Sequence, residues 1–554
     1  MIKTRITHSQ LKIKLQSIAN PPIVLISGEV IENVKRQKLY KGNSELITLD
    51  YEVERLGFNR RLNIRPAAIV YCTDEKQVAH VINIAKQNPE FPLRAKSTGH
   101  DHESESTGTD AIVIDFSLMN DFSLDEKNET ATISSGVRFK DIIPILDENN
   151  RSIPHGTCET VGVMGFTLGG GWGPWTRLHG MCCERLVGAT LIDGNGDIVH
   201  LSADNTDQKS KELLWALRGG GGFSFGILIK IVLKTFKQPK FTLRFMVNWK
   251  HLLGGVAVPP AMKILRNWEN VILPGKNERL IGTNLQINAI PLDDKSLENS
   301  IHECVFYGYY GADVESSDEL ERLLHSDLKL WFADTPASYV DVVTDAKKEE
   351  HSFSSWGRVS TLHKKLESEG KTPVLTHFPP DIDDPAPHKL TCRLVDEGGL
   401  GQEGRKSLIK SLRSNLISTN GIKAHIHTYV TLGAISGNFY TKEYIKPTFP
   451  EGCAFPYSKR PYTVQYQAWW NEEEIDKEEG KKYHVYQYIN DAMDWIQESR
   501  DAKIPQMHGS FISFKDSSIP TEKYFPGVYD QLRRIKQKYV NDKDNIFRTR
   551  KTIM

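Results

Sequence analysis

Two side chains with nucleophilic chemistry stand beside glycines at two places in the chain. His100 follows the segment RAKSTG, and Cys158, 58 positions later, lies in HGTCETVGVMGFTLGGGWGPW. A neutral imidazole nitrogen and a thiolate are both nucleophiles, and adjacent glycines let backbone amides approach a phosphate closely. Strand-like apolar segments join the two places. The pair therefore predicts a large anionic cofactor, held by backbone on one side and by side chains on the other.

The glycines themselves are concentrated in three places. Gly99 precedes His100, the segment GVMGFTLGGGWG spans 162–173, and LRGGGGFSFGILIKI begins at Leu217. Glycine removes the Cβ atom where another group must approach the backbone. Flexible linkers are the alternative, but linkers are rich in Ser and Pro, whereas apolar residues interrupt and flank these runs. We therefore interpret the glycines as cofactor contacts.

Other cofactor and catalytic motifs are missing or incomplete. No GxxxxGK[ST] phosphate loop and no GxSxG nucleophile motif occur. One GxGxxG string, at 399–404, precedes a helix-like segment, but no Asp or Glu follows before Glu443 to bind a ribose, so a loop before a helix explains it better. His100 and His102 could join nearby cysteines in a zinc site, but CxxC and HExxH spacings are absent. We predict no metal site.

The bulk properties describe a globular enzyme or binding protein with more than one domain. The 554 residues exceed one ordinary domain, and 39% hydrophobic and 25% charged residues are typical of globular proteins. A formal net charge of zero argues against binding to nucleic acid or to a membrane surface. Because the apolar runs are shorter than a membrane span and no secretion signal is evident, we expect a cytoplasmic protein.

The hydrophobic periodicity predicts an α+β fold with an inserted domain. Residues 51–236 alternate short strands, such as AIVIDFS, with turns and helices, such as TDEKQVAHVINIAKQN. Residues 237–500 contain longer strands, such as YTVQYQAWW, which indicate an antiparallel sheet flanked by amphipathic helices. Residues 501–554 return to a helix and a turn, and residues 1–50 precede everything as an N-terminal extension.

Several of these segments resemble, in order and spacing, the berberine-bridge-enzyme-like FAD-linked oxidases of the vanillyl-alcohol-oxidase superfamily. RAKSTGHDHE, GTCETVGVMGFTLGGGWGPWTRLHG and LLWALRGGGGFSFGIL resemble the family's PCMH-type FAD-binding domain. YFPGVYDQLRRIKQKYVNDKDNIF resembles its closing helix and turn, and CAFPYSKRPYTVQYQAWW resembles its substrate domain. The resemblance covers roughly residues 50 to 550. It implies a two-part FAD-binding domain (51–236 and 501–554) interrupted by a substrate-binding domain (237–500).

The resemblance assigns a role to the two nucleophiles. In relatives with both motifs, the histidine bonds covalently to the flavin 8α-methyl group and the cysteine to flavin carbon 6, which implies these roles for His100 and Cys158. The alternatives are a diphosphate-loop histidine without a bond and a buried structural thiol. The other residues that the resemblance implies for FAD binding are Ser97, Thr98, Gly99, Asp101, Gly162, Gly165, Gly170, Gly171, Gly226 and Ile227.

The chain also departs from the family pattern. The usual NFG is Ser224-Phe225-Gly226, and the tyrosine that often follows the triple glycine is Trp172. A YxNY-like segment, whose tyrosine assists proton removal in several relatives, is replaced by Phe511-Ile512-Ser513-Phe514. Phenylalanine cannot accept a proton, so the usual catalytic base is missing.

A substitute base can be sought by strand periodicity. In KAHIHTYVTLGAI, His425, His427, Tyr429 and Thr431 share one face of a strand, and we predict Tyr429 and His427 as candidate bases. Ordinary sheet core is the alternative for such aromatic residues. The predicted substrate-binding residues are Trp172, Gln465, Tyr466 and Trp469.

Flavin chemistry then predicts the reaction. A C–H bond next to oxygen or nitrogen delivers hydride to flavin N5, a base takes the proton, and O2 reoxidises the flavin and yields H2O2. We expect a small-molecule substrate that is bulky and partly apolar, of the kind found in specialised metabolism. The alternatives are a carbohydrate (oligosaccharide) oxidase, a flavin enzyme that catalyses a net non-redox cyclisation, and a binding protein without turnover. We expect O2 as a partner and neither nucleic acid nor membrane, and the sequence predicts no oligomeric state.

Overall fold

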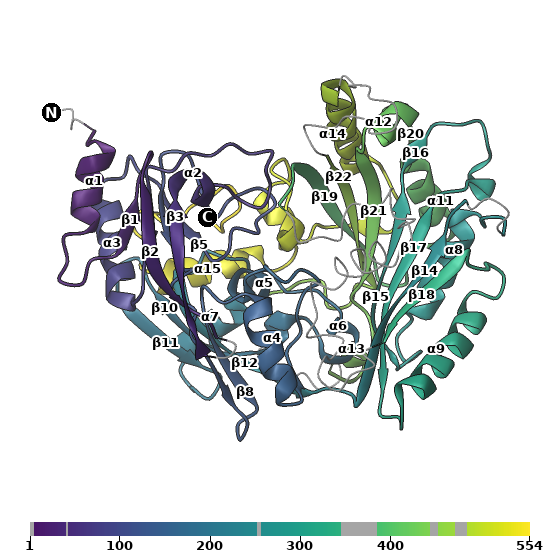
Figure 1. Ribbon diagram of the computed structural model, residues 1–554, viewed down its shortest axis with the longest axis horizontal. Coiled ribbons are helices and arrows are strands. Elements are labelled where there is room, and N and C mark those ends of the chain that lie inside the picture. Colours follow the sequence, from purple (N-terminus) through teal and green to yellow (C-terminus); the bar gives the residue numbers. More distant parts are fainter. Residues whose placement is uncertain (1–4, 40–41, 252–255, 345–384, 444–451, 471–484) are drawn as a thin grey trace.

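The structure, a computed structural model, describes residues 5–39, 42–251, 256–344, 385–443, 452–470 and 485–554. Two domains lie side by side, with the described residues up to 237 in the first and the described residues between 241 and 508 in the second (Figure 1). The C-terminal helix α15 (Tyr529–Tyr539) returns to the first domain and packs on α7 (Gln208–Leu217). The α+β class and the inserted antiparallel domain are therefore confirmed.

The first domain contains two sheets. The first sheet has the order β1-β4-β6-β5, in which β4 pairs in parallel with β6, and β6 with β5. All four residues of β4 and all four of β6 are buried. This pattern is typical of parallel strands in a sheet that is covered on both faces. The second sheet is antiparallel, with the order β11-β10-β12-β8-β7. The strands are β1 (Ile23–Leu25), β4 (Ala68–Tyr71), β5 (Leu93–Lys96), β6 (Ile112–Asp115), β7 (Phe122–Asp125), β8 (Thr130–Ser134), β10 (Leu186–Ile192), β11 (Ile198–Ser202) and β12 (Ile227–Lys234).

Helices and short strands complete the first domain. Helix α3 carries the apolar stripe that the sequence predicts, with Val78, Ile82 and Ala85 buried against the first sheet. The helices are α1 (His8–Leu15), α2 (Tyr51–Glu54), α3 (Glu75–Gln87), α4 (Phe139–Glu148), α5 (Val163–Leu168) and α6 (Thr176–His179). The short pairs are β2 (Val30–Gln37) with β3 (Ser44–Asp50) and β9 (Arg151–Ser152) with β13 (Phe236–Lys237).

The segment predicted as an N-terminal extension is part of the first domain. Strand β1 is the edge strand of the first sheet, where it pairs with β4. Leu11, Leu15 and Val24 are buried in the domain's main core. The prediction of a separate extension at 1–50 is therefore wrong, because strand pairing with a distant segment has no signal within those residues.

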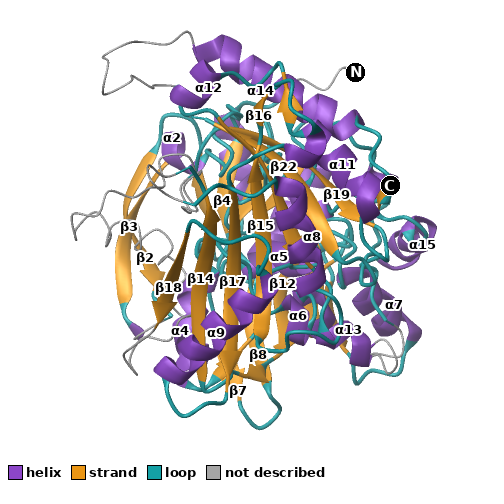
Figure 2. Ribbon diagram, turned by 90° about the vertical axis from the view of Figure 1, so that its right-hand side faces the viewer, coloured by secondary structure: helices purple, strands orange, loops and turns teal. Residues whose placement is uncertain are grey.

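The second domain is one eight-stranded antiparallel sheet with helices packed on one face. The order of its strands is β18-β14-β17-β15-β21-β22-β19-β23 (Figure 2). The strands are β14 (Phe241–Trp249), β15 (Leu280–Asn288), β17 (Cys304–Ala312), β18 (Tyr339–Thr344), β19 (His388–Val395), β21 (His427–Ala434), β22 (Tyr462–Trp469) and β23 (Met507–His508). The helices are α8 (Ala261–Val271), α9 (Ser317–Trp331), α11 (Gly401–Ser411), α12 (Thr419–Lys423), α13 (Asn438–Glu443) and α14 (Val485–Asp501). The GxGxxG string at 399–404 is the loop and first turn of α11, as predicted.

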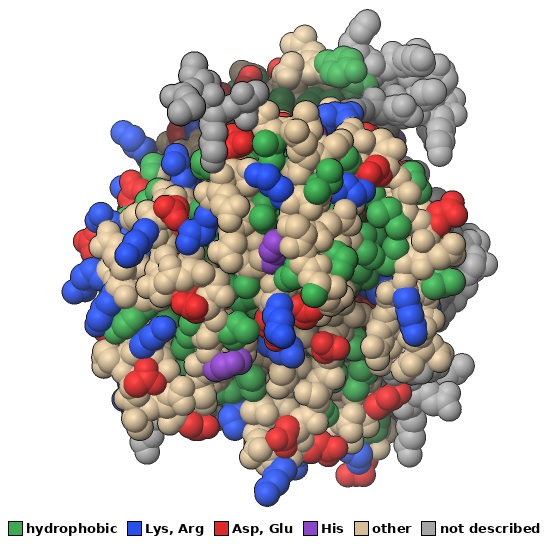
Figure 3. Space-filling view, turned by 90° about the vertical axis from the view of Figure 1, so that its left-hand side faces the viewer, with side chains coloured by type: hydrophobic (Ala, Val, Ile, Leu, Met, Phe, Trp, Pro, Cys, Tyr) green, Lys and Arg blue, Asp and Glu red, His purple; other side chains and the backbone are tan. Residues whose placement is uncertain are grey.

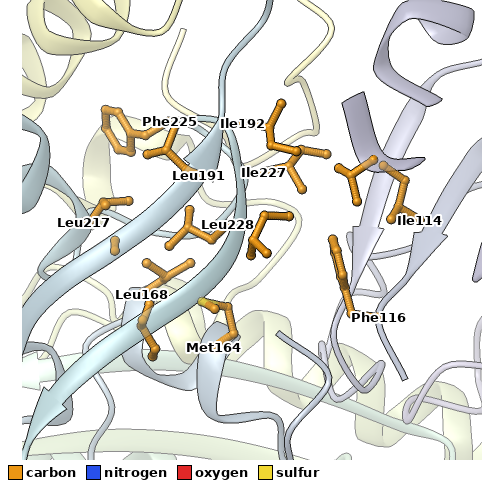
Figure 4. Packing of buried hydrophobic residues seen from close by; sticks show 14 of the residues in the cluster. Ile114, Phe116, Met164, Leu168, Leu191, Ile192, Leu217, Phe225, Ile227 and Leu228 are labelled. Atoms are coloured by element: carbon orange, nitrogen blue, oxygen red, sulfur yellow. The ribbon is translucent and has the colours of Figure 1, made fainter. Parts of the chain in front are cut away.

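Each domain has its own apolar core. Around β12, Ile227 and Leu228 lie between Leu191 of β10 and Phe116, which follows β6 (Figure 4). In the second domain, the core fills the space between the sheet and helices α8, α9, α11 and α14. The opposite face of that sheet is turned toward the first domain (Figure 1).

On the face that Figure 3 shows, neither basic nor acidic side chains form a large patch of one charge. Basic and acidic side chains are intermixed over this face of the first domain. Within the described residues, no helix combines the length and apolar character needed to cross a membrane.

Candidate active site

A cavity of about 400 Å³ lies between the first domain and the free face of the eight-stranded sheet. Its volume is in the range of sites for small ligands. The first domain contributes three glycine-rich segments, around residues 97–101, 156–169 and 221–228. The second domain contributes residues of β15, β17, β21 and β22, and the C-terminal segment contributes 511–515, Thr549 and Lys551. The two nucleophiles of the sequence, His100 and Cys158, both line this one cavity.

The loop after β5 lines the cavity with six consecutive residues, from Ser97 to His102. Gly99 has a φ of +79°, a left-handed conformation that favours glycine. The hydroxyl of Ser97 donates to the carbonyl oxygen of Ser135 at 2.5 Å, which ties the loop to the end of β8. The loop therefore presents backbone to the cavity in the way that an anion-binding turn requires.

The imidazole of His100 contacts the ring of Phe58 and the hydroxyl of Thr160. Its imidazole stacks on Phe58, with ring centroids 3.7 Å apart and an interplanar angle of 23°. Its Nε2 atom lies 2.9 Å from Oγ1 of Thr160. Phe58 and Thr160 were not predicted as site residues, because neither stands in a glycine-rich segment next to His100.

Cys158 differs from most other cysteines of the chain in its surroundings. Cys72, Cys182, Cys304 and Cys392 are buried, and burial raises the pKa of each thiol. Cys158 is partly exposed and is the one cysteine of the seven that lines the cavity. This position matches the predicted attachment role and not that of a buried structural thiol.

The glycines predicted to contact the flavin differ in what surrounds them. A Cβ atom at Gly162 would lie 2.3 Å from Oγ of Ser97, so this glycine allows the two loops to meet. Gly170 and Gly171, with φ of +119° and +79°, do not line the cavity and face protein side chains, including Phe511 and Cys182. The structure therefore does not bring these two glycines to the cavity, where their contact with the flavin was predicted.

The glycine that does face open space is Gly165. It lines the cavity, and a Cβ atom there would have no neighbour within 4 Å. Gly226, with φ of +110°, and Ile227 also line the cavity, as predicted. A Cβ at Gly226 would lie 2.7 Å from the Ile192 carbonyl oxygen, so this glycine also allows β12 to begin beside β10.

Replacing Gly165 by Ala is expected to separate folding from cofactor binding. Alanine is favoured over glycine inside helix α5, so the apoprotein should be as stable or up to about 1 kcal/mol more stable. The new methyl group projects into the cavity, so we expect FAD affinity to fall by at least roughly tenfold. Thermal unfolding of the apoprotein and FAD titration measure the two effects. Unchanged FAD affinity would place the flavin away from Gly165.

The sheet face toward the cavity is polar. The residues that line the cavity from this sheet are Asn284, Gln286, Tyr307, Tyr429, Thr431, Gln465, Gln467 and Trp469. Strand alternation turns the intervening residues, such as Val430 and Val464, into the core beneath the helices. Sequence reasoning missed Asn284, Gln286, Tyr307 and Gln467. The alternation in NLQIN (284–288) is a signal that could have found the first two.

Alternation also corrects one predicted substrate residue. Gln465 and Trp469 line the cavity as predicted, but Tyr466 between them is fully buried on the other face. The Tyr466 hydroxyl lies 2.7 Å from that of Ser411, and its ring packs on Trp495. Adjacent residues of a strand point to opposite faces, so Gln465 and Tyr466 cannot both contact one substrate.

The two candidate bases are also separated by the structure. Tyr429 lines the cavity, whereas His427, at the first position of β21, does not. His425 precedes the strand with a left-handed φ of 54°, so the predicted common face begins only at His427. Tyr429 is retained as a candidate and His427 is not.

A hydrogen-bond network fixes the side chains around Tyr429. The Tyr429 hydroxyl donates to Oε1 of Gln467 at 3.2 Å, and Trp469 Nε1 donates to the same oxygen at 2.9 Å. The Gln467 amide donates to Oγ1 of Thr431 at 3.1 Å. Because Gln467 Oε1 only accepts, it orients the hydroxyl proton of Tyr429 toward itself.

Trp172 forms part of the wall where the two domains meet. It lines the cavity, and its Nε1 donates to the carbonyl oxygen of Ala434 at 2.6 Å. A Cβ atom at Gly433 would lie 2.6 Å from the indole ring, so the sheet has no side chain there. The predicted placement of Trp172 at the cavity is therefore supported by the structure.

A pair of neutral histidines joins the two domains beside the cavity. His102 Nδ1 lies 2.9 Å from His388 Nε2, and His388 Nδ1 lies 2.8 Å from the carbonyl oxygen of Ala386. A carbonyl only accepts, so His388 donates from Nδ1 and accepts at Nε2 from His102. Burial lowers the pKa of His102 to about 3 and lowers that of His388 well below its usual value. His388 in turn stacks on Trp469, with ring centroids 4.0 Å apart.

The C-terminal segment closes the cavity without a titratable tyrosine. Phe511, Ile512, Ser513 and Phe514 line it, as the departure from the YxNY-like pattern predicts. Lys515 Nζ donates to Oδ2 of Asp101 at 2.6 Å. Burial alone would raise the pKa of Asp101, but the charge and hydrogen bond of Lys515 bring it below its usual value. The described residues contain no cluster of His, Cys, Asp and Glu that could hold a metal.

Known families match both parts of the first domain. The family described as FAD binding domain matches residues 66–202, and the family described as berberine and berberine like matches residues 510–554. The cavity fits FAD, because an anion-binding loop, an open glycine and apolar β12 residues line one continuous space.

Individual relatives agree with the families. The chain is 32% identical to a glucooligosaccharide oxidase of Sarocladium strictum over 251 residues, which are 44% of this chain and 47% of that protein. It is 25% identical to berberine bridge enzyme-like 21 of Arabidopsis thaliana over 512 residues, 90% of this chain and 84% of that protein. It shares its fold with the solved glucooligosaccharide oxidase from Acremonium strictum (TM-score 0.64, 20% identity, 90% of this chain and 94% of that one), which is described as carrying a 6-S-cysteinyl, 8α-N1-histidyl FAD. These matches show an FAD-dependent oxidoreductase that is similar to the berberine-bridge-enzyme-like FAD-linked oxidases.

Proposed function

We propose that this protein is an FAD-dependent oxidase that carries its flavin through two covalent bonds, from His100 and Cys158, and oxidises a hydroxyl-bearing carbon of a carbohydrate. The observation that supports it is the composition of the cavity. Both nucleophiles lie on its first-domain side, and a sheet face rich in amide, hydroxyl and aromatic groups lies on the other.

The environment of His100 indicates which ring atom would bond. Oγ1 of Thr160 lies 2.9 Å from Nε2, so we assign the flavin bond to Nδ1. The stacked Phe58 holds the ring plane in place. The same nitrogen bears the flavin in the related oxidase described as an 8α-N1-histidyl protein. Cys158 reaches the cavity from a separate loop, so the two bonds would hold the flavin at two points.

FAD, when bound, supplies the hydride acceptor at N5 and passes the electrons to O2, which yields H2O2. The protein must then hold the substrate hydroxyl and remove its proton. Tyr307 and Tyr429 are the ionisable side chains that the described part of the sheet presents to the cavity. Because the Tyr429 hydroxyl donates its hydrogen bond to Gln467, its oxygen is oriented so that a substrate hydroxyl can donate to it. We assign the role of proton acceptor to Tyr429 in its phenolate form, which first releases its own proton to solvent and then takes the proton of the substrate hydroxyl.

The sheet face favours a carbohydrate over the bulky, partly apolar metabolite that the sequence suggests. Asn284, Gln286 and Gln465 are amides with hydrogen-bonding capacity beyond their internal bonds, which suits a ligand with many hydroxyl groups. Trp469, held by its bond to Gln467, offers an aromatic wall. Oδ1 of Asn284 is buried and has no hydrogen-bond partner within the described residues, so a mainly apolar substrate would leave it unsatisfied at a cost of roughly 1–3 kcal/mol, whereas a substrate hydroxyl could donate to it.

Anaerobic mixing with candidate substrates tests this function. Gluco-, xylo- and chito-oligosaccharides should bleach the flavin absorbance within seconds, and admission of O2 should restore it with formation of one H2O2 per turnover. Apolar benzylic and allylic alcohols serve as the control class and should react at least about 100-fold more slowly. Bleaching by the apolar alcohols alone would return the assignment to specialised metabolism. Turnover of a substrate without bleaching would indicate a net non-redox cyclisation.

Replacing Tyr429 by Phe is expected to lower the rate constant of flavin reduction by about 10²- to 10⁴-fold, the usual contribution of a general base. Tyr307→Phe is the matched control, because Tyr307 lies on the same face in a different strand. It should change the reduction rate by less than about tenfold. Stopped-flow reduction measures both variants. The reverse order of effects would assign the proton to Tyr307.

A further inference from the structure

The last six residues of the chain, 549–554 (the C-terminal tail), pack into the first domain. The backbone N–H of Ile553 donates to Oγ of Ser224 at 3.0 Å, and Nε of Arg533 donates to the carbonyl oxygen of Met554 at 2.8 Å. Thr552 and Ile553 are buried. Ser224 is the first residue of the Ser224-Phe225-Gly226 sequence that replaces the family's NFG. This departure therefore provides the anchor of the tail.

The tail also presents a cation to the cofactor cavity. Lys551 lines the cavity, although only 7% of its surface is exposed to solvent. Its Nζ donates to the carbonyl oxygen of Ser517 at 3.0 Å and to that of Ile519. An ammonium group has three hydrogens to donate, so two carbonyls leave one donor for a further acceptor.

No carboxylate of the described residues forms a direct ion pair with Lys551. Glu103, Glu105 and Asp516 attract its charge from a greater distance, but each is paired with another cation: Glu105 with Arg550 at 2.6 Å, Glu103 with Lys389 at 2.6 Å, and Asp516 with Lys389 at 3.4 Å. Burial lowers the pKa of Lys551. A buried cation without a direct ion-pair partner is stabilised by an added anion, so this position suits an anion supplied from the cavity.

The loop beside Lys551 continues the cofactor loop after His100. Arg550 connects the tail to that loop, because its backbone N–H and Nε donate to Glu105 and its Nη2 donates to the carbonyl oxygen of Glu103. Glu105 and Ser106 line the cavity together with Lys551. The tail therefore places its lysine near the end of the segment that begins with Ser97, Thr98 and Gly99.

We propose that Lys551 binds the diphosphate of FAD, so that the C-terminal tail completes the cofactor site. The diphosphate carries the formal negative charges of FAD at neutral pH, and the backbone of loop 97–101 supplies hydrogen bonds without a full positive charge. This inference rests on FAD binding alone. It does not depend on the covalent bonds or on the carbohydrate substrate.

The test uses the full chain with His100→Ala and Cys158→Ser, in which FAD binds reversibly and its Kd is measured by flavin fluorescence. Lys551→Gln in this background should weaken FAD binding roughly 10- to 100-fold, as expected for loss of a charged hydrogen bond. Lys551→Arg keeps the charge and should stay within about threefold of the parent.

The matched control is Lys250→Gln. Lys250 is also buried, but it follows β14 in the second domain and does not line the cavity. Its loss should change the thermal stability and leave the FAD Kd within about twofold. An unchanged Kd for Lys551→Gln, or equal weakening by Lys250→Gln, would overturn the proposal.

A second variant covers the case in which Lys551→Gln does not fold. Ser224→Ala removes the anchor of the tail and leaves the lysine in place. Weaker FAD binding by this variant, at least about threefold, supports the proposal, and an unchanged Kd contradicts it. Failure of the oligosaccharide assay with a normal Lys551 effect would refute the substrate assignment alone.

Discussion

Acid precipitation of the His100→Ala, Cys158→Ser double variant is expected to leave all of the yellow flavin in the supernatant, whereas the unaltered protein should carry it entirely into the pellet. The reason is that acid unfolds the cavity, after which only a covalent bond can retain the flavin. Each single variant should keep the flavin in its pellet, because the other bond remains. Peptide mapping should find modified peptides at His100 in Cys158→Ser, and at Cys158 in His100→Ala.

Cys453→Ser is the matched control for this experiment. Cys453 is the other partly exposed cysteine of the chain, but it does not line the cavity. Its replacement should leave both attachment sites intact. Flavin retained in the pellet of the double variant would show that another residue bears it, and flavin in the supernatant of the unaltered protein would remove the covalent claim altogether.

The second large effect is a loss of stability in mild acid. Burial lowers the pKa of His102, His155 and His179 to about 3 and that of His302 to about 4. In the unfolded chain these groups bind protons near pH 6.5. Their neutral forms thus favour the folded state fully above about pH 6.5, and this stability is lost as the pH falls toward their folded pKa values.

The size of the effect follows from the number of protons taken up. Each such histidine lowers the free energy of unfolding by about 1.4 kcal/mol for each pH unit below its unfolded pKa. The four together therefore lower it by roughly 5 kcal/mol per pH unit. Against a total stability of about 5–15 kcal/mol, we expect unfolding between about pH 4 and pH 5.5. The free energy of unfolding in urea, measured at several pH values, gives the slope.

A variant of His155 measures how much this one residue contributes to the pH dependence of the free energy of unfolding. Its Nδ1 lies 3.1 Å from the Gly156 carbonyl oxygen, and its Nε2 accepts from Trp175 Nε1 at 2.9 Å, so a proton on Nε2 would break that bond. His155→Gln should reduce the proton uptake by about one. Val78→Ala, in the core beneath α3, is the control, since it should lower stability at every pH and keep the slope. An undiminished slope in His155→Gln would show that His155 is not one of the acid-sensitive groups.

Much of the cofactor site could be predicted from the sequence because its determinants are local. The loop at Ser97–Asp101 needs a strand, a left-handed glycine and a histidine, all within a few residues. Cys158 and the following glycines are also contiguous. Likewise, period-two alternation predicted β21 and β22 and placed Tyr429, Gln465 and Trp469 on strands that line the cavity.

The sequence alone predicted an anionic cofactor between His100 and Cys158 and, through the family resemblance, FAD, because short motifs whose residues act within their own loops carry these features. Hydrophobic periodicity predicted the α+β class. Only the tertiary structure decided which neighbours meet across the cavity. It joined His102 to His388, brought Tyr307 and Asn284 to the same cavity as Tyr429, and turned Tyr466 into the core. Such contacts link segments that lie far apart in the chain. Strand order and register, which create them, leave no mark in the residues on either side alone.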